Sequence, residues 1–370
     1  MIYNISNAVA VERLAGPFEK ASDALARLDE RLRASPLAEA YIIRAHFQDA
    51  CAALWRQGEF VQIEDLVLRD AGMDVRAPTH ELVRAERVLS ARRRIASQPP
   101  AWALTESGID ALRGLQTSRS RDLDHKTDRE DDGCDEAVDE GAFYEDEYAL
   151  AAVFDEIDAV IARTSATTNA AKCPRRDDSG LVYDEDWDED RLLAQWRAAL
   201  DETETMPPLI AAALAYDAWE TIEPLQHQGW LGALLAGAVL RARGKTRHHL
   251  ASLYVGFRHM RGRRSRLQDL TTRLVGFAEA AETTAALGMK EIERLALSRE
   301  LLMRKCAGRR KNSKLPQLVD LCLRLPIISA PLAAKELGVS QQAAATMIDE
   351  VSSNLRELTE RRRYRCWAII

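Results

Sequence analysis

The residues of this 370-residue chain that could do chemistry gather in one loop between two apolar runs. Residues 221–230 read ThrIleGluProLeuGlnHisGlnGlyTrp, so Glu223 stands directly before Pro224, and Gly229 precedes the second run. Pro224 disfavours helix at Glu223, and Gly229 permits a tight turn. A loop that leads into a helix presents unpaired N–H groups at the positive end of the helix dipole. The sequence therefore predicts a loop suited to holding an anion.

The runs on either side of this loop must position it. Leu209 to Trp219 and Leu231 to Val239 are apolar on nearly every side. A helix without a polar face is buried in the middle of a domain. We therefore expect two central helices with the loop held between them.

This helix–loop–helix resembles the core of the Fic family, enzymes that use a His-Pro-Phe-x-x-Gly-Asn-Gly-Arg-x-x-Arg loop to transfer the AMP of ATP to a protein hydroxyl. Residues 209–224, LeuIleAlaAlaAlaLeuAlaTyrAspAlaTrpGluThrIleGluPro, are similar to the family's approach helix. Residues 231–240, LeuGlyAlaLeuLeuAlaGlyAlaValLeu, are similar to the helix that follows its loop. The resemblance implies a Fic-like helical bundle.

The chemical groups of that family are missing from this loop. Glu223 stands where the family has its catalytic histidine, and one residue is missing after Gln228. Trp230 and Ala233 stand where the family has arginines that hold phosphate. The residues that survive are scaffold residues, namely Pro224, Gly229 and Gly232. The resemblance therefore implies a vestigial loop with no catalytic residue and no cofactor.

The resemblance also concerns a regulatory segment near the N-terminus. Many members carry an inhibitory Ser-x-x-x-Glu-Gly-like segment, whose glutamate pairs with a loop arginine and blocks ATP. Aligning the helix that follows puts Gln57 at the position of that glutamate. The inhibitory glutamate and the arginine it restrains would then both be absent. A loose alignment of the N-terminal region is the alternative.

The histidines, cysteines and acidic residues do not predict a metal site. The six cysteines are scattered without a CxxC pair, which indicates reduced thiols and no disulfide framework. His248 and His249 are adjacent, so they lack the spacing that places two imidazoles on one face of a helix. The acidic run 118–141 lacks the ligand spacing of a calcium loop, and it is typical of a solvated linker.

Charge is distributed unevenly along the chain. The net charge of −7 combines about +9 over residues 241–273 and +7 over 290–370 with −23 for the rest. A basic C-terminal third on an acidic body indicates contact with a polyanion, although basic runs are also common on solvated helix faces. The stretch 258–266 (ArgHisMetArgGlyArgArgSerArg) could contact nucleic acid, an acidic partner or the chain's own acidic half.

The last sixty or so residues have the pattern of a winged helix-turn-helix. Ser329 caps one expected helix, and Ser340 caps the next, which begins at Gln341 after a GlyValSer turn. A short hairpin with a basic tip follows, and many bacterial Fic proteins end in a similar tail. The residues expected to contact DNA are Ser340, Gln341, Gln342 and Thr346 on the helix, and Arg361, Arg362, Arg363 and Arg365 on the wing.

The fold class expected from these patterns is mainly α: a Fic-like helical bundle followed by a small winged helix-turn-helix domain with a short C-terminal β-hairpin. Residues 267–287 and 289–307 are expected as two helices. The expected divisions are an N-terminal helical region (1–117), an acidic linker or mobile loop (118–141), a Fic-like core (142–307), a basic hinge (308–314) and the winged helix-turn-helix (315–370).

These observations favour a bacterial DNA-binding regulator with a catalytically degenerate Fic-like body, and double-stranded DNA as its partner. The alternatives are an AMP-transferase-like enzyme with unconventional residues, and a protein-interaction module in which the tail serves contact or dimerisation. A homodimer is compatible with the sequence. No apolar run approaches the roughly 20 residues that cross a bilayer, and the N-terminus lacks a signal-peptide pattern, so we expect a cytoplasmic protein.

Overall fold

Two apolar helices, α9 (Pro208–Ile222) and α10 (Leu231–Ala242), pack against each other at the centre of the fold, as the sequence predicts. They belong to a computed structural model that describes residues 11–73, 77–114, 187–260, 268–307, 313–358 and 365–369. The chain divides into two units, residues 1–117 with 189–370, and residues 118–188. All contacts given below lie within the first unit. The expected acidic linker, 118–141, lies outside the described residues.

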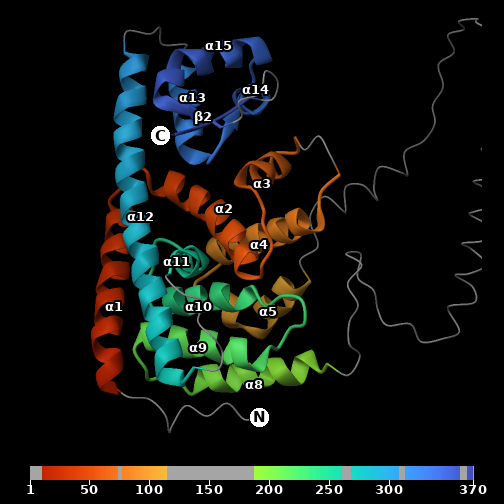
Figure 1. The fold of residues 1–370 in the computed structure, drawn as a ribbon, viewed down its shortest axis with the longest axis vertical. Helices are drawn as coiled ribbons and strands as arrows, with labels where there is room; N and C mark the ends of the chain where they lie inside the picture. Colours follow the sequence, from red (N-terminus) through yellow and green to blue (C-terminus); the bar gives the residue numbers. More distant parts are fainter. Residues whose placement is uncertain are drawn as a thin grey trace, which may run out of the picture. The chain divides into compact units, whose positions relative to one another are not determined.

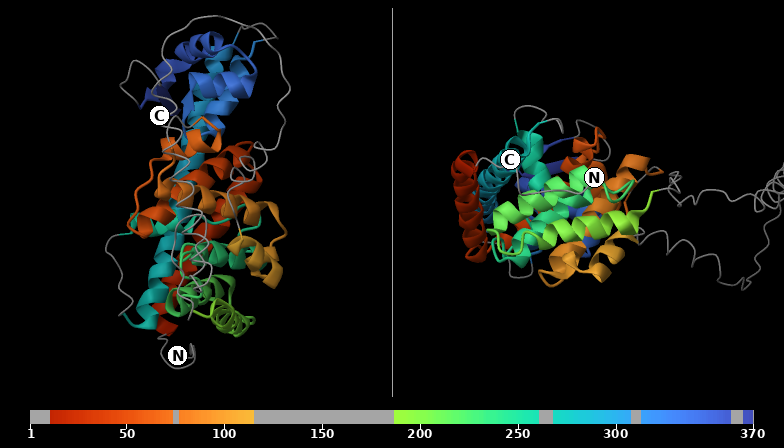
Figure 2. Two further views of the ribbon diagram at one scale, coloured as in Figure 1. Left: turned by 90° about the vertical axis from the view of Figure 1, so that its right-hand side faces the viewer. Right: turned by 90° about the horizontal axis from the view of Figure 1, so that it is seen from below.

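The remaining helices of the body surround this pair. Figure 2 shows α8, α9 and α10 lying side by side. Thr79 and Thr105 cap the helices that follow them, because each hydroxyl accepts a hydrogen bond from the backbone N–H three residues on. The other helices of the body are α1 (Val11–Arg33), α2 (Ala38–Arg56), α3 (Ile63–Asp70), α4 (His80–Ser97), η1 (Trp102–Leu104), α5 (Glu106–Arg113), α8 (Glu189–Asp201), α11 (Leu253–His259) and α12 (Leu270–Cys306).

Helix α12 is one continuous helix of 37 residues that packs along α1 (Figure 1). The expectation of two helices divided near Gly288 is wrong. A Cβ at Gly288 would come within 2.6 Å of the Tyr41 hydroxyl and 2.8 Å of Leu28. Glycine is needed here because α1 and α2 pack closely on α12 and leave no room for a side chain. Its usual effect of weakening a helix does not end α12 at this point.

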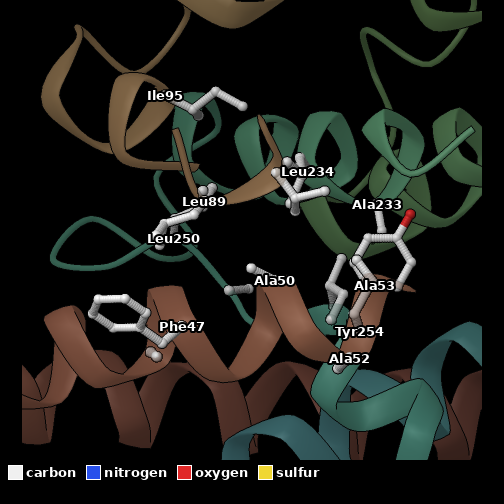
Figure 3. Packing of buried hydrophobic residues seen from close by; sticks show 14 of the residues in the cluster. Phe47, Ala50, Ala52, Ala53, Leu89, Ile95, Ala233, Leu234, Leu250 and Tyr254 are labelled. Carbon is white, nitrogen blue, oxygen red and sulfur yellow. The ribbon is translucent and has the colours of Figure 1, made fainter. Parts of the chain in front are cut away.

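The core of the body is filled by side chains from several helices and from one extended segment. Figure 3 shows Phe47 and Ala50 of α2, Leu89 of α4 and Leu234 of α10 facing a common interior with Leu250. All five side chains are buried. Many residues at these contacts are alanine or glycine, which allows the helix backbones to approach closely.

An ion pair between Arg92 of α4 and Asp49 of α2 lies inside this core, and both side chains are 0% exposed. Arg92 also donates hydrogen bonds to the Leu250 carbonyl at 3.2 Å and to Ser252 Oγ at 3.2 Å. Asp49 accepts a hydrogen bond from the Val255 amide at 3.0 Å. Burial raises the pKa of Asp49, and the positive charge of Arg92 opposes that rise. The pair therefore joins α2, α4 and the segment leading into α11.

The C-terminal region forms the expected helix-turn-helix with a small sheet. Strand β3 lies between β1 and β2 and pairs with each of them in antiparallel fashion, so Ile328 faces Trp367, and Leu355 faces Ile369. Strand β1 was not expected, because two residues are too short for an alternating pattern. The elements are α13 (Leu315–Arg324), β1 (Ile328–Ser329), α14 (Ala330–Leu337), α15 (Gln341–Val351), η2 (Ser352–Asn354), β2 (Leu355–Glu357) and β3 (Cys366–Ile369). The mainly α fold class is confirmed.

None of the helices in the described ranges combines the length and apolar content that a membrane span requires.

Replacement of Arg92 by alanine should lower the free energy of unfolding by about 3–5 kcal/mol, because it leaves Asp49 buried without its counter-charge. Urea unfolding followed by circular dichroism measures the change. Arg27→Ala is the control, since Arg27 is exposed and, among the described residues, pairs only with Asp23 one helical turn away. It should change the value by about 0.5 kcal/mol or less. Equal effects of the two substitutions would contradict the role given to the buried pair.

Candidate functional site

The loop between α9 and α10 begins with a sharp turn at Glu223. Its φ of 49° and ψ of 60° place it in the left-handed region, and no other non-glycine residue among those described has a positive φ. The Glu223 amide donates to the Trp219 carbonyl at 2.9 Å, which ends α9. Glu223 is exposed, whereas Pro224 and Leu225 are buried. The loop therefore leaves the helix at the residue where Pro224 was expected to end it.

Three backbone amides in the loop and at the start of α10 have acceptors within the chain. At the start of α10, the Leu231 amide donates to the Gln228 carbonyl at 2.9 Å, and the Gly232 amide donates to the Gly229 carbonyl at 3.3 Å. Inside the loop, the Gln226 amide donates to a carboxylate oxygen of Glu189 at 3.4 Å. The expectation of open amides at these three positions is wrong. A carboxylate from α8 is hydrogen-bonded inside the loop.

Arg113 holds that carboxylate in place from the other side. Its guanidinium pairs with Glu189 and with Asp190, each at 2.9 Å. The side-chain amide of Gln228 donates to the Arg113 carbonyl at 3.1 Å. The end of α5, the start of α8 and the loop are therefore joined by one hydrogen-bonded group.

The two positions at which the resemblance expects arginines are filled by core residues. Trp230 is 3% exposed and Ala233 is 1% exposed. The Trp230 carbonyl accepts a hydrogen bond from the Tyr254 hydroxyl at 2.7 Å. A Cβ at Gly232 would lie 2.4 Å from Trp219 Cδ1, so this glycine is required by the contact between α9 and α10. These residues build a scaffold around the loop and present no cation to it.

Gln57, which the resemblance aligns with the inhibitory glutamate, lies beside this loop. A Cβ at Gly229 would be 3.7 Å from Gln57 Nε2. Gln57 Oε1 accepts a hydrogen bond from Arg84 at 2.5 Å, and Arg84 also pairs with Glu59. The end of α2 thus contacts the loop with a neutral amide.

A histidine–aspartate pair exists in the structure that the sequence did not reveal. His249 Nδ1 lies 2.9 Å from Asp29 Oδ1, and Asp29 also accepts the amides of Arg247 at 3.0 Å and His248 at 2.8 Å. Burial raises the pKa of Asp29, but these hydrogen bonds outweigh burial and hold it below its ordinary value. His249 is only 4% exposed, so the pair fastens a segment to α1 and is closed to a substrate. Positions 29 and 249 lie too far apart in sequence for any spacing rule to join them.

The second candidate site is the start of α15. Ser340 Oγ accepts a hydrogen bond from the Ala343 amide at 3.2 Å, so it is the N-cap that the sequence predicts. Gln341 and Gln342 are exposed in the first turn, and Ala344 and Ile348 are buried on the opposite face. Thr346 is exposed one turn further on, and its hydroxyl donates to the Gln342 carbonyl at 2.9 Å.

Of the expected wing residues, only Arg365 is described; Arg361, Arg362 and Arg363 lie outside the described residues. Arg365 donates two hydrogen bonds to Glu357, at 2.8 and 2.6 Å, across the β2–β3 pair. These bonds hold the pKa of Glu357 below its ordinary value. The guanidinium also stands 5.0 Å from the centre of the Trp367 ring. Arg365 therefore stabilises the hairpin, and part of its charge is already compensated.

The basic stretch 258–266 is described only as far as Met260. Arg258 and His259 end α11 and are exposed, with the Arg258 guanidinium 5.9 Å from the centre of the Trp55 ring. Within the part of the chain that the structure describes, no three His, Cys, Asp or Glu side chains converge as a metal site would require.

Comparisons with known proteins place a domain of known type at the C-terminus. Residues 181–307 match the family "Protein of unknown function (DUF1612)", and residues 315–370 match "HTH DNA binding domain". The second match confirms the helix-turn-helix predicted there. A relative from Sinorhizobium fredii (strain NBRC 101917 / NGR234), "Uncharacterized protein y4cF", is 40% identical over 385 residues, which covers 100% of both chains. A solved Fic family protein from Desulfovibrio desulfuricans G20 aligns with 100% of this chain and 98% of its own at 13% identity, with a TM-score of 0.47.

Gly232→Ala should lower the free energy of unfolding by about 1–3 kcal/mol, because the new methyl group collides with the fully buried Trp219 ring. Gly229→Ala is the matched control in the same loop, since its Cβ would meet Gln57 at an ordinary contact distance of 3.7 Å. Thermal unfolding of both variants provides the test. A Gly232→Ala protein as stable as the control would show that the close contact between α9 and α10 does not require glycine.

Proposed function

The chain belongs to the same family as y4cF of Sinorhizobium fredii and ends in an HTH DNA binding domain, and on that premise we propose that it is a bacterial transcriptional regulator whose Fic-like body is not an enzyme. Its partner is double-stranded DNA, and its place of action is the cytoplasm. The observation that carries the proposal is the exposed, capped first turn of α15.

The start of α15 supports recognition of base edges. Gln341 and Gln342 are exposed where a recognition helix enters the major groove. A glutamine side chain can bond an adenine edge with both the oxygen and the nitrogen of its amide. Ser340 fixes the first turn by capping it. The basic balance of residues 290–370 would bring this domain to DNA by long-range attraction, while the acidic remainder of the chain is repelled.

The state of the central loop supports the absence of catalysis. Phosphoryl and nucleotidyl transfer depend on cations that stabilise negative charge as it develops on phosphate. Here the positions of the family's arginines are buried Trp230 and Ala233, and the Gln226 amide is bonded to the carboxylate of Glu189. That amide is therefore not free to donate to a triphosphate. Glu223 is an exposed carboxylate, and such a group is a weak base toward a hydroxyl.

Incubation with labelled ATP, CTP or UTP and candidate protein targets should give no incorporation above that of a heat-killed control. The same assay should remain negative for Glu223→His, because a histidine without the arginines has no held triphosphate to act on. Incorporation by the native chain that Glu223→Ala abolishes would overturn the proposal. Self-modification by Glu223→His would show that the loop still binds nucleotide.

DNA binding should depend on α15 and on the wing in different ways. Gln342→Ala should weaken binding to the preferred site by about 1–3 kcal/mol and leave random DNA unaffected, since it removes a base contact. Neutralising a wing arginine that contacts phosphate should weaken binding to all DNA and lower the salt slope by about 1. Titrations at several salt concentrations, after selection of a site from random genomic fragments, measure both effects.

The matched control for the wing is Arg31→Gln, an exposed arginine on α1 outside the HTH domain. The triple substitution Arg361→Ala/Arg362→Ala/Arg363→Ala with unchanged affinity and unchanged salt slope would reject the wing as a DNA contact. Failure of the native chain to shift any genomic fragment would favour the interaction-module alternative over a DNA-binding regulator.

A further inference from the structure

A cavity of about 370 Å³ opens between α2, the start of α3, α11 and α12. Its lining includes no residue of the loop 221–230, so it is separate from the vestigial loop. The volume is at the small end of the range for pockets that bind small molecules. The proposed function gives this space no role.

One wall of the cavity is apolar. Val61 and Ile63 come from the start of α3, Val255 from α11 and Leu287 from α12. Cys51 adds a buried thiol, whose pKa is raised to about 12 by burial, so this group is neutral at physiological pH. These side chains would contact the hydrocarbon part of a ligand.

The charged groups at the cavity leave one positive charge uncompensated. Glu291 pairs with Arg44 at 2.9 Å and with Arg294 at 2.8 Å, so its charge is balanced. Arg258 makes no ion pair with any carboxylate among the described residues. His259 beside it donates its Nδ1 proton to the Val255 carbonyl at 2.8 Å, so Arg258 is the group that would meet a ligand's negative charge. A small anion bound at this end of the cavity would pair with the Arg258 guanidinium and compensate its charge.

Glu291 also connects the cavity to the HTH domain. Arg44, which pairs with it, donates a hydrogen bond to the Leu325 carbonyl at 2.6 Å, directly after α13. Arg294, its other partner, donates to the Ile369 carbonyl at 2.7 Å, at the end of β3. A single carboxylate in the cavity wall therefore orients two arginines that hold the HTH domain at two points.

We propose that this cavity binds a small amphipathic carboxylate, with the carboxylate at Arg258 and the apolar part against α3, α11 and Leu287, and that occupancy is transmitted through Glu291 to the HTH domain. This goes beyond the proposed function, since it assigns the body a ligand and its chemical class.

Binding is tested with 4-phenylbutyrate, and with 4-phenylbutylamine and 4-phenylbutanol as cationic and neutral compounds of matched shape. Calorimetry at millimolar concentrations should detect the carboxylate and find weaker or no binding of the other two. Arg258→Gln should weaken carboxylate binding about tenfold or more, because it removes a charge-assisted hydrogen bond. Arg31→Gln, exposed on α1 and outside the cavity, should bind as the native chain does. Equal binding of the amine, no binding of the carboxylate, or equal affinities of the two variants would each overturn the site.

Transmission is tested by amide hydrogen exchange, which needs no DNA and is therefore independent of the proposed function. Saturating 4-phenylbutyrate should change exchange in peptides covering residues 315–358 of the native chain, and should change it less in Arg258→Gln at the same concentration. Binding of the carboxylate with unchanged exchange in these peptides would overturn the coupling through Glu291.

Discussion

The ion pair between Arg92 and Asp49 is the interaction on which the arrangement of the body depends. Two buried charges are costly unless they are paired and hydrogen-bonded, and here the partners of Arg92 and Asp49 come from α2, α4 and the segment from Leu250 to Val255, with only Arg92 Nε left unbonded. The ion pair thereby fixes the positions of α2, α4 and this segment relative to one another. The apolar side chains of the core pack around it. The approach of α11 to α12 follows from this, with Gly256 close enough to Ala280 that a Cβ there would lie 2.1 Å from its carbonyl oxygen.

The central loop is held in place by the protein's own groups. The turn at Glu223 and the close packing of Gly232 on Trp219 keep the loop in place. Its interior is occupied by protein groups, since Glu189 accepts a loop amide and Arg113 neutralises Glu189. The scaffold is thus stabilised by internal hydrogen bonds of the kind that a bound anion would otherwise make.

Helix α12 packs against helices of both the body and the HTH domain, and so connects the two. Its first half packs on α1 and α9, its middle lines the cavity at Thr284 and Glu291, and its second half packs on α13. Arg294 of α12 and Arg44 of the neighbouring α2 donate hydrogen bonds to carbonyls of the HTH domain. Lys335 of α14 donates to the Ala71 carbonyl after α3. Packed elements of this kind shift between discrete arrangements when a contact changes. Helix α15, which we propose reads DNA, packs directly on α12 and α13.

The sequence by itself determined the local elements: the apolar pair α9 and α10, the turn before Pro224, the caps at Ser329 and Ser340, and the helix-turn-helix that the family match confirms. Periodicity, capping and turn chemistry act over a few residues, so a single sequence displays them. Only the tertiary structure decided that Gly288 lies inside a continuous helix, that Asp29 pairs with His249 across 220 positions, and that Glu189 bonds to the loop. It also placed Arg258 and Glu291 in one cavity. These contacts join residues far apart in the chain, and they are fixed by packing, which no local pattern records.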